Sequence, residues 1–190
     1  LAGKHRVIGQ VGHVERFNAA LNAVAADVRD PKYIEATRTS GYTFRSTDIG
    51  VVLDVMIRDI DIVWSLANST VQDVQALGVS VLGSHEDMAT ARLSFASGCV
   101  ANLSASRVSF QQKRAMTVIT PRGSASINFA THEATVVRPR EDVLRREFHV
   151  DQLSPTERTY WKEHLFDELL VHSRCDLPPG NAIQEEQRDF

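Results

Sequence analysis

The sequence is poor in cysteine, and it has neither a long apolar run nor an excess of basic residues. Its two cysteines, Cys99 and Cys175, cannot form a disulfide framework, and we interpret both as reduced thiols of a cytoplasmic protein. A membrane helix needs about 20 consecutive apolar residues, and a secretory signal needs a basic and then apolar leader. Neither is found. With a net charge of −3, the chain is also not expected to bind nucleic acid.

Motifs that bind cofactors or metals are missing as well. The segment GQVG, residues 9–12, lacks the third glycine and the surrounding βαβ unit of a dinucleotide-binding loop. The seven histidines are scattered, without the spacing and acidic support of a metal site, and no G-x-S-x-G elbow occurs. We therefore predict neither a dinucleotide site nor a metal site in this stretch of chain.

What the sequence does contain is a pattern of helices at both ends and strands between them. An apolar content of 43% and a charged content of 24% are typical of a soluble globular domain. Segments with a helical period, the first starting at the N-cap Asn18 and the last at Asn181, cover residues 18–28, 51–68, 154–174 and 181–190. Residues 41–50 read as a loop, with Thr47 or Asp48 as the cap of the second helix.

The remaining periodic segments alternate with a period of two, which is typical of strands. They cover residues 6–14, 32–40, 71–82, 87–95, 99–107, 114–120, 124–130 and 133–139, with a further candidate at 144–150. Short turns between them favour an antiparallel meander. The predicted fold class is therefore α+β, a large open, mainly antiparallel sheet with helices packed on one face.

The two faces of the hairpin formed by residues 87–107 differ in polarity. One face is apolar and should receive the helices. The opposite face suits either water or a second flat sheet. Its side chains are small and mostly uncharged: Thr90, Arg92, Ser94, Asn102, Ser104 and Ser106.

The helix at residues 51–68 carries a polar stripe on an otherwise apolar surface. Asp54, Arg58 and Asp61 recur at steps of four and three, so they fall within about 60° of one face. The stripe could face water, form a structural salt bridge or line a site. An exposed pair between Asp54 and Arg58 would contribute only about 0.3–0.5 kcal/mol, and the residues alone favour that structural interpretation.

Three segments, taken in order, resemble the C-terminal half of the Gfo/Idh/MocA family of NAD(P)-dependent oxidoreductases. They are VGHVERFN at residues 11–18, TDIGVVLDVMIRDIDIV at 47–63 and EDMATARLSFASGCVANLSASR at 86–107. The resemblance implies that residues 1–190 are a substrate-binding and oligomerisation domain, cut at both ends from a longer chain. A Rossmann domain before Leu1 would bind NAD or NADP, and this fragment alone would bind neither.

The resemblance also implies the site residues. The family's helix carries an Asp-x-x-x-His pair beside the nicotinamide, and here Asp54 and Arg58 occupy the two positions. Arginine cannot serve as a general base, but it can bind a carboxylate or polarise a carbonyl oxygen. Asp54 would orient the substrate or accept its proton. Arg16, Phe17 and Asn18 match the cluster that lines the family's substrate pocket.

Two functions follow from these expectations. The first is one domain of an NAD(P)-dependent oxidoreductase that acts on a sugar, cyclitol or related polyol and forms homo-oligomers through the sheet face. As a fragment it would be inactive. The alternative is a non-catalytic dimerisation scaffold, or a degenerate member of the family that has lost its histidine.

Overall fold

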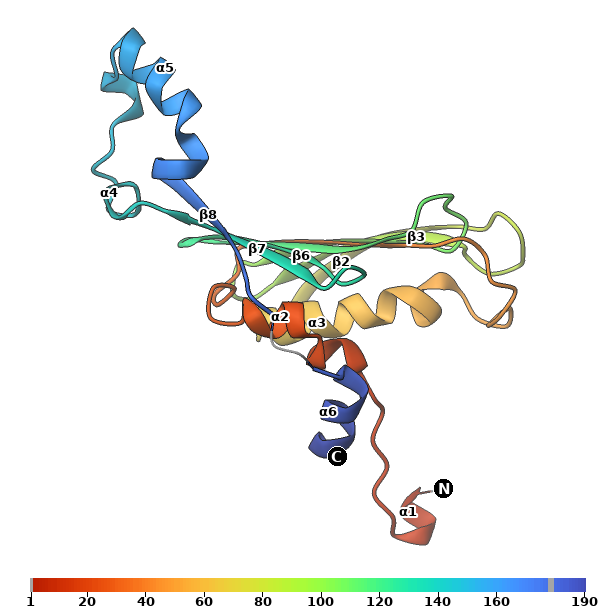
Figure 1. Ribbon diagram of the computed structural model, residues 1–190. Coiled ribbons are helices and arrows are strands. Elements are labelled where there is room, and N and C mark those ends of the chain that lie inside the picture. The colour runs from red at the N-terminus through yellow and green to blue at the C-terminus, as the bar shows by residue number, and fades with distance from the viewer. Residues whose placement is uncertain (1, 178–179) are drawn as a thin grey trace.

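Eight strands in the described residues, 2–177 and 180–190, form one open sheet in the computed structural model (Figure 1). Their order across the sheet is β2-β3-β4-β1-β5-β6-β7-β8, and every neighbouring pair is antiparallel except β1 and β4. The bounds are β1 Tyr33–Thr39, β2 Val71–Val79, β3 Met88–Phe95, β4 Val100–Ser106, β5 Lys113–Thr120, β6 Gly123–Asn128, β7 Glu133–Pro139 and β8 Leu170–Arg174. The predicted α+β class with a mainly antiparallel sheet is confirmed.

The order of the strands corrects the predicted meander. Strand β1 comes first in the chain but lies between β4 and β5, parallel to the former and antiparallel to the latter. Alternation along a segment predicts a strand but not its lateral neighbours. Ile34 and Ala36 of β1 are buried, so this strand is placed at the centre of the sheet, where both neighbours shield it.

The helical segments between residues 14 and 67 lie along one face of the sheet, and the opposite face is open (Figure 1). Helix α2, Ala19–Ala23, starts where predicted, because the Asn18 side chain accepts a hydrogen bond from the Ala20 N–H at 3.0 Å. The long helix comprises a π-helical turn, η2 at Val52–Met56, followed by α3 at Ile57–Ala67. The face of the β3–β4 hairpin that receives these helices is the predicted apolar one, with Leu93, Phe95, Cys99, Ala101, Leu103 and Ala105 buried.

Two predictions around the first helices are wrong. Residues 7–13 form an exposed coil rather than a strand, between α1 at Ala2–His5 and the 3₁₀ turn η1 at Val14–Phe17. Neither Thr47 nor Asp48 caps the long helix, whose first turn begins at Val51. The N–H of Val51 instead donates to the main-chain oxygen of Glu86, at 2.9 Å. A neighbouring segment thus does what a local cap was expected to do.

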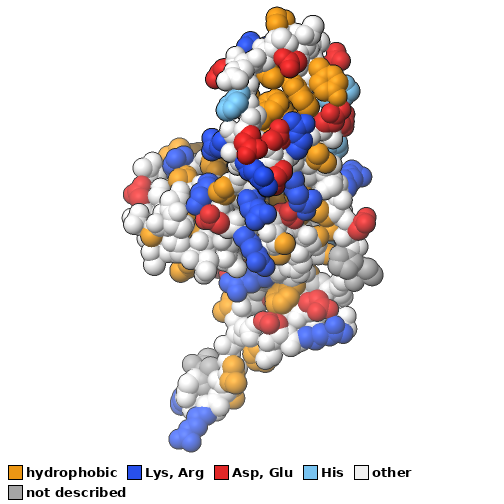
Figure 2. Space-filling view, turned by 90° about the vertical axis from the view of Figure 1, so that its left-hand side faces the viewer, with side chains coloured by type: hydrophobic (Ala, Val, Ile, Leu, Met, Phe, Trp, Pro, Cys, Tyr) orange, Lys and Arg blue, Asp and Glu red, His pale blue; other side chains and the backbone are white. Residues whose placement is uncertain are grey.

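The chain between β7 and β8 forms an arm that projects beyond the sheet (Figure 1). It contains α4 at Glu141–Leu144, the turn η3 at Val150–Gln152, α5 at Pro155–Glu163 and the π-helical turn η4 at Leu165–Leu169. Hydrophobic side chains gather in this arm, and Lys and Arg side chains gather below it (Figure 2). In the described residues, none of the helices is long and apolar enough to cross a membrane.

The arm corrects two further expectations. Residues 144–149 form the end of α4 and a coil instead of a strand, and Val150 begins η3. Residues 154–174 begin as a helix, but residues 170–174 form β8, which pairs with β7 at the edge of the sheet. The helical period of residues 154–174 is a local pattern. It does not show that residues 170–174 can form main-chain hydrogen bonds with β7. The last helix, α6 at Ala182–Asp189, is capped by Asn181 as predicted.

Arg107, directly after β4, holds the start of the long helix in place. Its Nε donates to Asp87 at 2.8 Å, and its Nη1 donates to the main-chain oxygens of Ser46 and Ile49 at 3.1 and 2.8 Å. Asp87 is fully enclosed, and its second oxygen accepts from the N–H groups of Leu82 and Val81. One buried ion pair therefore connects the loop before the long helix, at residues 46–49, with the loop after β2, at residues 81–82.

These contacts predict an acid-dependent loss of stability. The N–H groups of Leu82 and Val81, together with the Arg107 guanidinium, lower the pKa of Asp87 to about 2. An unfolded aspartate has a pKa of about 3.9, so the unfolded chain binds this proton first as the pH falls. Asp87 therefore stabilises the fold above about pH 4, and this contribution disappears as the pH falls towards 2.

We expect Asp87→Asn to lower the free energy of unfolding at pH 7 and to have a smaller effect near pH 2.5, as measured by urea unfolding. Asp151→Asn, at an exposed aspartate in η3, is the matched control and should change little at either pH. A difference between Asp87→Asn and the natural chain that stays constant with pH would contradict the prediction.

Candidate functional site

A groove of about 590 Å³ separates the segment before α2 from the first half of the long helix. One wall comes from the coil and η1, and the other from η2 and the first turn of α3. Asp54 and Arg58 from the predicted stripe both line this groove, so the stripe does face an open hollow. The lining residues are Val11, Gly12, His13, Val14, Glu15, Leu53, Asp54, Ile57 and Arg58.

Asp54 lies within the π-helical turn and is partly sheltered, with 26% of its side chain exposed. Its cationic neighbour is Arg107, whose Nη1 is 3.9 Å from Asp54 Oδ2. Arg58 donates instead to the main-chain oxygen of Asp54, at 2.5 Å. The side-chain salt bridge that the sequence favoured for Asp54 and Arg58 is therefore replaced by two other contacts. Single π-helical turns inside α-helices are frequent at functional sites.

Asp59 of α3 does not belong to the stripe, because it faces the sheet. There it forms a buried ion pair with Arg38 of β1, whose Nη2 is 2.7 Å from Asp59 Oδ1. Arg38 Nη1 also donates to Glu15 of η1 at 2.9 Å. Only 6% of the Arg38 side chain is exposed. A single guanidinium thus connects β1, α3 and η1, and it holds the two walls of the groove together.

Asp61, one turn further along the stripe, binds Arg16 and faces His13. Arg16 donates through Nε and Nη2 to the two carboxylate oxygens of Asp61 at 2.6 and 2.5 Å. The Nδ1 of His13 is 3.5 Å from Asp61 Oδ2. Arg16 and Asp61 line a neighbouring hollow of about 660 Å³ next to Ser65. The structure therefore places Arg16 beside the stripe, but bound to Asp61, about two helical turns away from Asp54.

The other two residues predicted to bind substrate lie differently. Asn18 is buried, and its side chain caps α2 and donates to Glu15 at 3.2 Å. Phe17 is half-buried in η1. These positions give Asn18 an architectural role in shaping the wall of the groove.

The glycines near residue 12 offer no cradle for a dinucleotide. Gly9 and Gly12 lie in an exposed coil rather than between a strand and a helix. A Cβ atom at Gly12 would lie 2.5 Å from the Glu186 carboxylate of α6, so an acidic group occupies the space beside this glycine. A carboxylate repels a phosphate. Across residues 2–177 and 180–190, His, Cys, Asp and Glu side chains form no group of three that could hold a metal ion.

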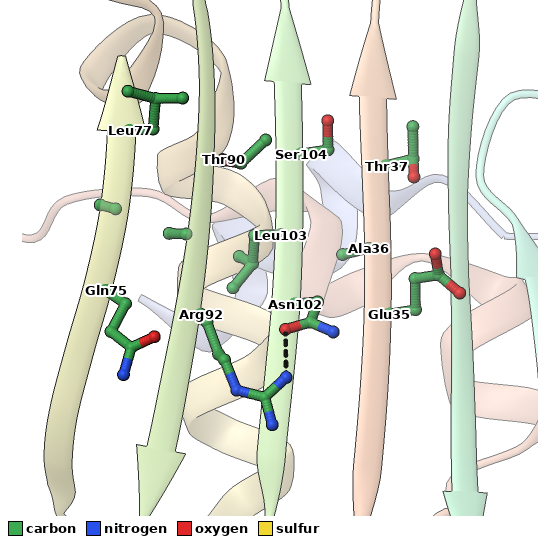
Figure 3. Close-up of a pocket in the computed structure, with 12 residues that line it drawn as sticks. Glu35, Ala36, Thr37, Gln75, Leu77, Thr90, Arg92, Asn102, Leu103 and Ser104 are labelled. Atoms are coloured by element: carbon green, nitrogen blue, oxygen red, sulfur yellow. Dashed lines mark hydrogen bonds between the residues drawn. The ribbon is translucent and has the colours of Figure 1, made fainter.

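The open face of the sheet carries a second, shallower hollow of about 440 Å³ over β1 to β4 (Figure 3). Gln75, Arg92, Asn102 and Glu35 lie in register across the four strands. Asn102 accepts a hydrogen bond from Arg92 at 3.4 Å and donates one to the Tyr33 hydroxyl at 3.1 Å. This polar row is separated from the groove by the thickness of the sheet and the helix layer.

Comparison with known proteins places this geometry in a family. Residues 8–126 match the sequence model of the GFO/IDH/MocA C-terminal domain. UDP-N-acetylglucosamine 3-dehydrogenase of Acidithiobacillus ferrooxidans is 35% identical over 130 residues, which cover 68% of this chain and 42% of that protein.

Solved structures agree. UDP-N-acetylglucosamine 3-dehydrogenase GnnA from Acidithiobacillus ferrooxidans is similar with a TM-score of 0.76 and 28% identity, over 99% of this chain and 52% of that chain. An NAD binding oxidoreductase from Klebsiella pneumoniae shares the fold, with a TM-score of 0.61 and 17% identity over 72% of this chain and 45% of that chain. The chain spans about half the length of these relatives.

The buried ion pair between Arg38 and Asp59 predicts a strongly non-additive double-mutant cycle. Arg38→Met leaves a buried carboxylate without its partner and should lower the free energy of unfolding by about 3–5 kcal/mol. Arg38→Met combined with Asp59→Leu removes both charges and should be less destabilising than Arg38→Met alone. Urea unfolding measures Arg38→Met, Asp59→Leu and the double variant. The control is Arg114→Met, at the exposed arginine opposite Arg38 on β5. Additive effects would refute a buried pair.

Proposed function

We propose that this chain, which belongs to the GFO/IDH/MocA family, forms the substrate side of an NAD(P)-dependent dehydrogenase that oxidises a hydroxyl group of a sugar. The predicted family is confirmed. The observation that carries the proposal is the groove in which Asp54 and Arg58 lie together beside a π-helical turn. The 35% identical relative is named for UDP-N-acetylglucosamine, so a nucleotide-linked amino sugar is the first substrate to test.

The two stripe residues have different roles in this proposal. Asp54 is partly exposed and lies 3.9 Å from Arg107, so its carboxylate is held in place and can orient the reacting hydroxyl group. Arg58 keeps its proton and can only donate hydrogen bonds, which suits it to bind an oxygen of the substrate or product. Together they position the oxygen at which oxidation takes place.

A dinucleotide-binding unit is proposed to cover the groove and to supply NAD or NADP. The rim of the groove supports this, because the apolar side chains of Leu53 and Val11 are exposed there, with 63% and 82% of their surface in solvent. A second unit packed on this rim would bury them and exclude water from the groove. When bound, the dinucleotide would accept a hydride, and the present residues would handle the proton.

A non-catalytic scaffold is the competing function, and one observation favours it. Arg58 occupies the position of the family's histidine, and an arginine cannot accept a proton. A dehydrogenase should lose turnover when Asp54 is replaced. A scaffold has no turnover to lose.

We expect Asp54→Asn, made in the full-length protein, to lower kcat by about 10²-fold, because a neutral amide does not attract and orient the reacting hydroxyl group as a carboxylate does. The assay follows NADH or NADPH formation with UDP-N-acetylglucosamine and related sugars. Asp73→Asn, at an exposed aspartate on β2, is the matched control. A natural protein that oxidises none of these substrates with either cofactor would favour the scaffold.

The chain is also proposed to form homo-oligomers by stacking the open face of the sheet against a second copy. This face is flat and polar, and it carries opposite charges on one row, Glu35 on β1 and Arg92 on β3, with Asn102 between them (Figure 3). A two-fold axis through the hollow would let Arg92 of each copy approach Glu35 of the other.

A charge swap tests this arrangement. Arg92→Glu should weaken the oligomer by placing like charges opposite each other, and adding Glu35→Arg in the same chain should restore it. Light scattering at several concentrations measures the mass. Arg114→Glu, on the helix side of the sheet, serves as the control. The proposal is wrong if the swapped double variant stays as dissociated as Arg92→Glu, or if the natural chain is a monomer at tens of micromolar.

A further inference from the structure

His13 lies in the same groove as Asp54 and Arg58, although η1, α2 and β1 separate it from the long helix in the sequence. It immediately precedes η1, and 27% of its side chain is exposed, so a molecule in the groove can reach it. The long helix has an arginine where a proton acceptor was expected. The coil on the opposite wall supplies an imidazole, which is a side chain that can accept a proton near neutral pH.

The imidazole faces a carboxylate that is itself held in place. Asp61 Oδ2 is 3.5 Å from His13 Nδ1, and only 11% of the Asp61 side chain is exposed. Both oxygens of Asp61 also accept hydrogen bonds from Arg16, so the carboxylate cannot rotate away. A carboxylate facing Nδ1 favours the neutral tautomer with its hydrogen on that nitrogen. Nε2 is then left with a free lone pair.

Charged groups of both signs surround His13. Asp61 of α3 faces its Nδ1 and is itself paired with Arg16 of η1, and Asp54 lies on the opposite wall of the groove. Glu15 of η1 is bound to Arg38, and Glu186 of α6 lies next to Gly12, the residue before His13. Arg58 is the positive group on the opposite wall. It can stabilise negative charge on the substrate oxygen as the proton leaves.

We propose that Nε2 of His13 accepts the proton of the reacting substrate hydroxyl, and that Asp61 is the residue that positions the imidazole. The inference rests on the proposed function. The O–H bond breaks and its proton forms an N–H bond on Nε2. The C–H bond on the carbon that bears this oxygen breaks, and the hydrogen leaves with the bonding electron pair as a hydride to the nicotinamide dinucleotide. The electron pair of the O–H bond forms the second carbon–oxygen bond of the carbonyl. Imidazole becomes imidazolium.

This assignment divides the roles between two walls of the groove. Asp54 and Arg58 on the helix hold the oxygen, and His13 on the coil takes the proton. The loss of the family's histidine from the helix is then compatible with catalysis. For this, the two walls must stay close together. Arg38 keeps them so, because it binds Glu15 of η1 and Asp59 of α3.

Kinetics of the full-length protein test the role of His13. His13→Ala should lower kcat by about 10²- to 10⁴-fold with little change in KM, and free imidazole added to the assay should restore part of the rate. Asp61→Asn should cause a smaller loss of kcat that imidazole does not restore. His149→Ala, at an exposed histidine in the arm, is the control. Unchanged turnover in His13→Ala overturns the proposal, as does a loss that imidazole fails to rescue.

A second measurement needs neither substrate nor cofactor. Nitrogen NMR of the isotope-labelled imidazole in this chain reports which ring nitrogen carries the hydrogen. We expect the Nδ1–H form of His13 to dominate when the ring is neutral, and Asp61→Asn to remove that preference. A dominant Nε2–H form overturns the proposal. If the natural protein oxidises no sugar but the Nδ1–H form is found, the proposed function fails while the pairing of His13 with Asp61 stands.

Discussion

The buried guanidinium of Arg38 is the constraint on which the groove depends. An arginine cannot lose its proton, so among apolar side chains it requires carboxylates within hydrogen-bond distance. Asp59 of α3 and Glu15 of η1 supply them, at 2.7 and 2.9 Å. The two carboxylates belong to segments that are far apart in the chain. One buried charge therefore fixes both walls of the groove relative to the centre of the sheet.

The position of β1 beside β4 brings a second buried arginine, Arg107, close to Arg38. Because β1 and β4 run parallel in register, with Thr39 opposite Ser106, Arg38 and Arg107 lie at the same end of neighbouring strands. Arg107 binds Asp87 and the loop before the long helix, and it approaches Asp54. Two buried cations thus hold the π-helical turn and the first turns of α3. If β1 and β4 were antiparallel, Arg38 and Arg107 would lie at opposite ends of the two strands, because both arginines are at the carboxyl end of their strand.

The sheet separates the two roles proposed for this chain, substrate binding and oligomerisation. Its helix side carries the groove, where charged groups of opposite sign converge around a space for a small molecule. Its open side presents small polar side chains in flat rows and suits contact with another sheet. The oligomer proposed here would therefore leave the groove free, and the two proposals can be tested by substitutions that do not share residues.

The sequence by itself determined most of the strands, the capped helix at Asn18 and the apolar face of the β3–β4 hairpin, because periodicity and capping are local properties of a chain. Together with the resemblance it also predicted Asp54 and Arg58 as a pair, and the structure shows both lining one groove. Only the tertiary structure decided that residues 7–13 lack a partner strand, that residues 170–174 add an edge strand, and that β1 enters the middle of the sheet. The pairing of Arg38 with Asp59 and of His13 with Asp61 was likewise invisible in the sequence. Those contacts join segments separated by loops and strands, and their energy depends on burial, which no local pattern specifies.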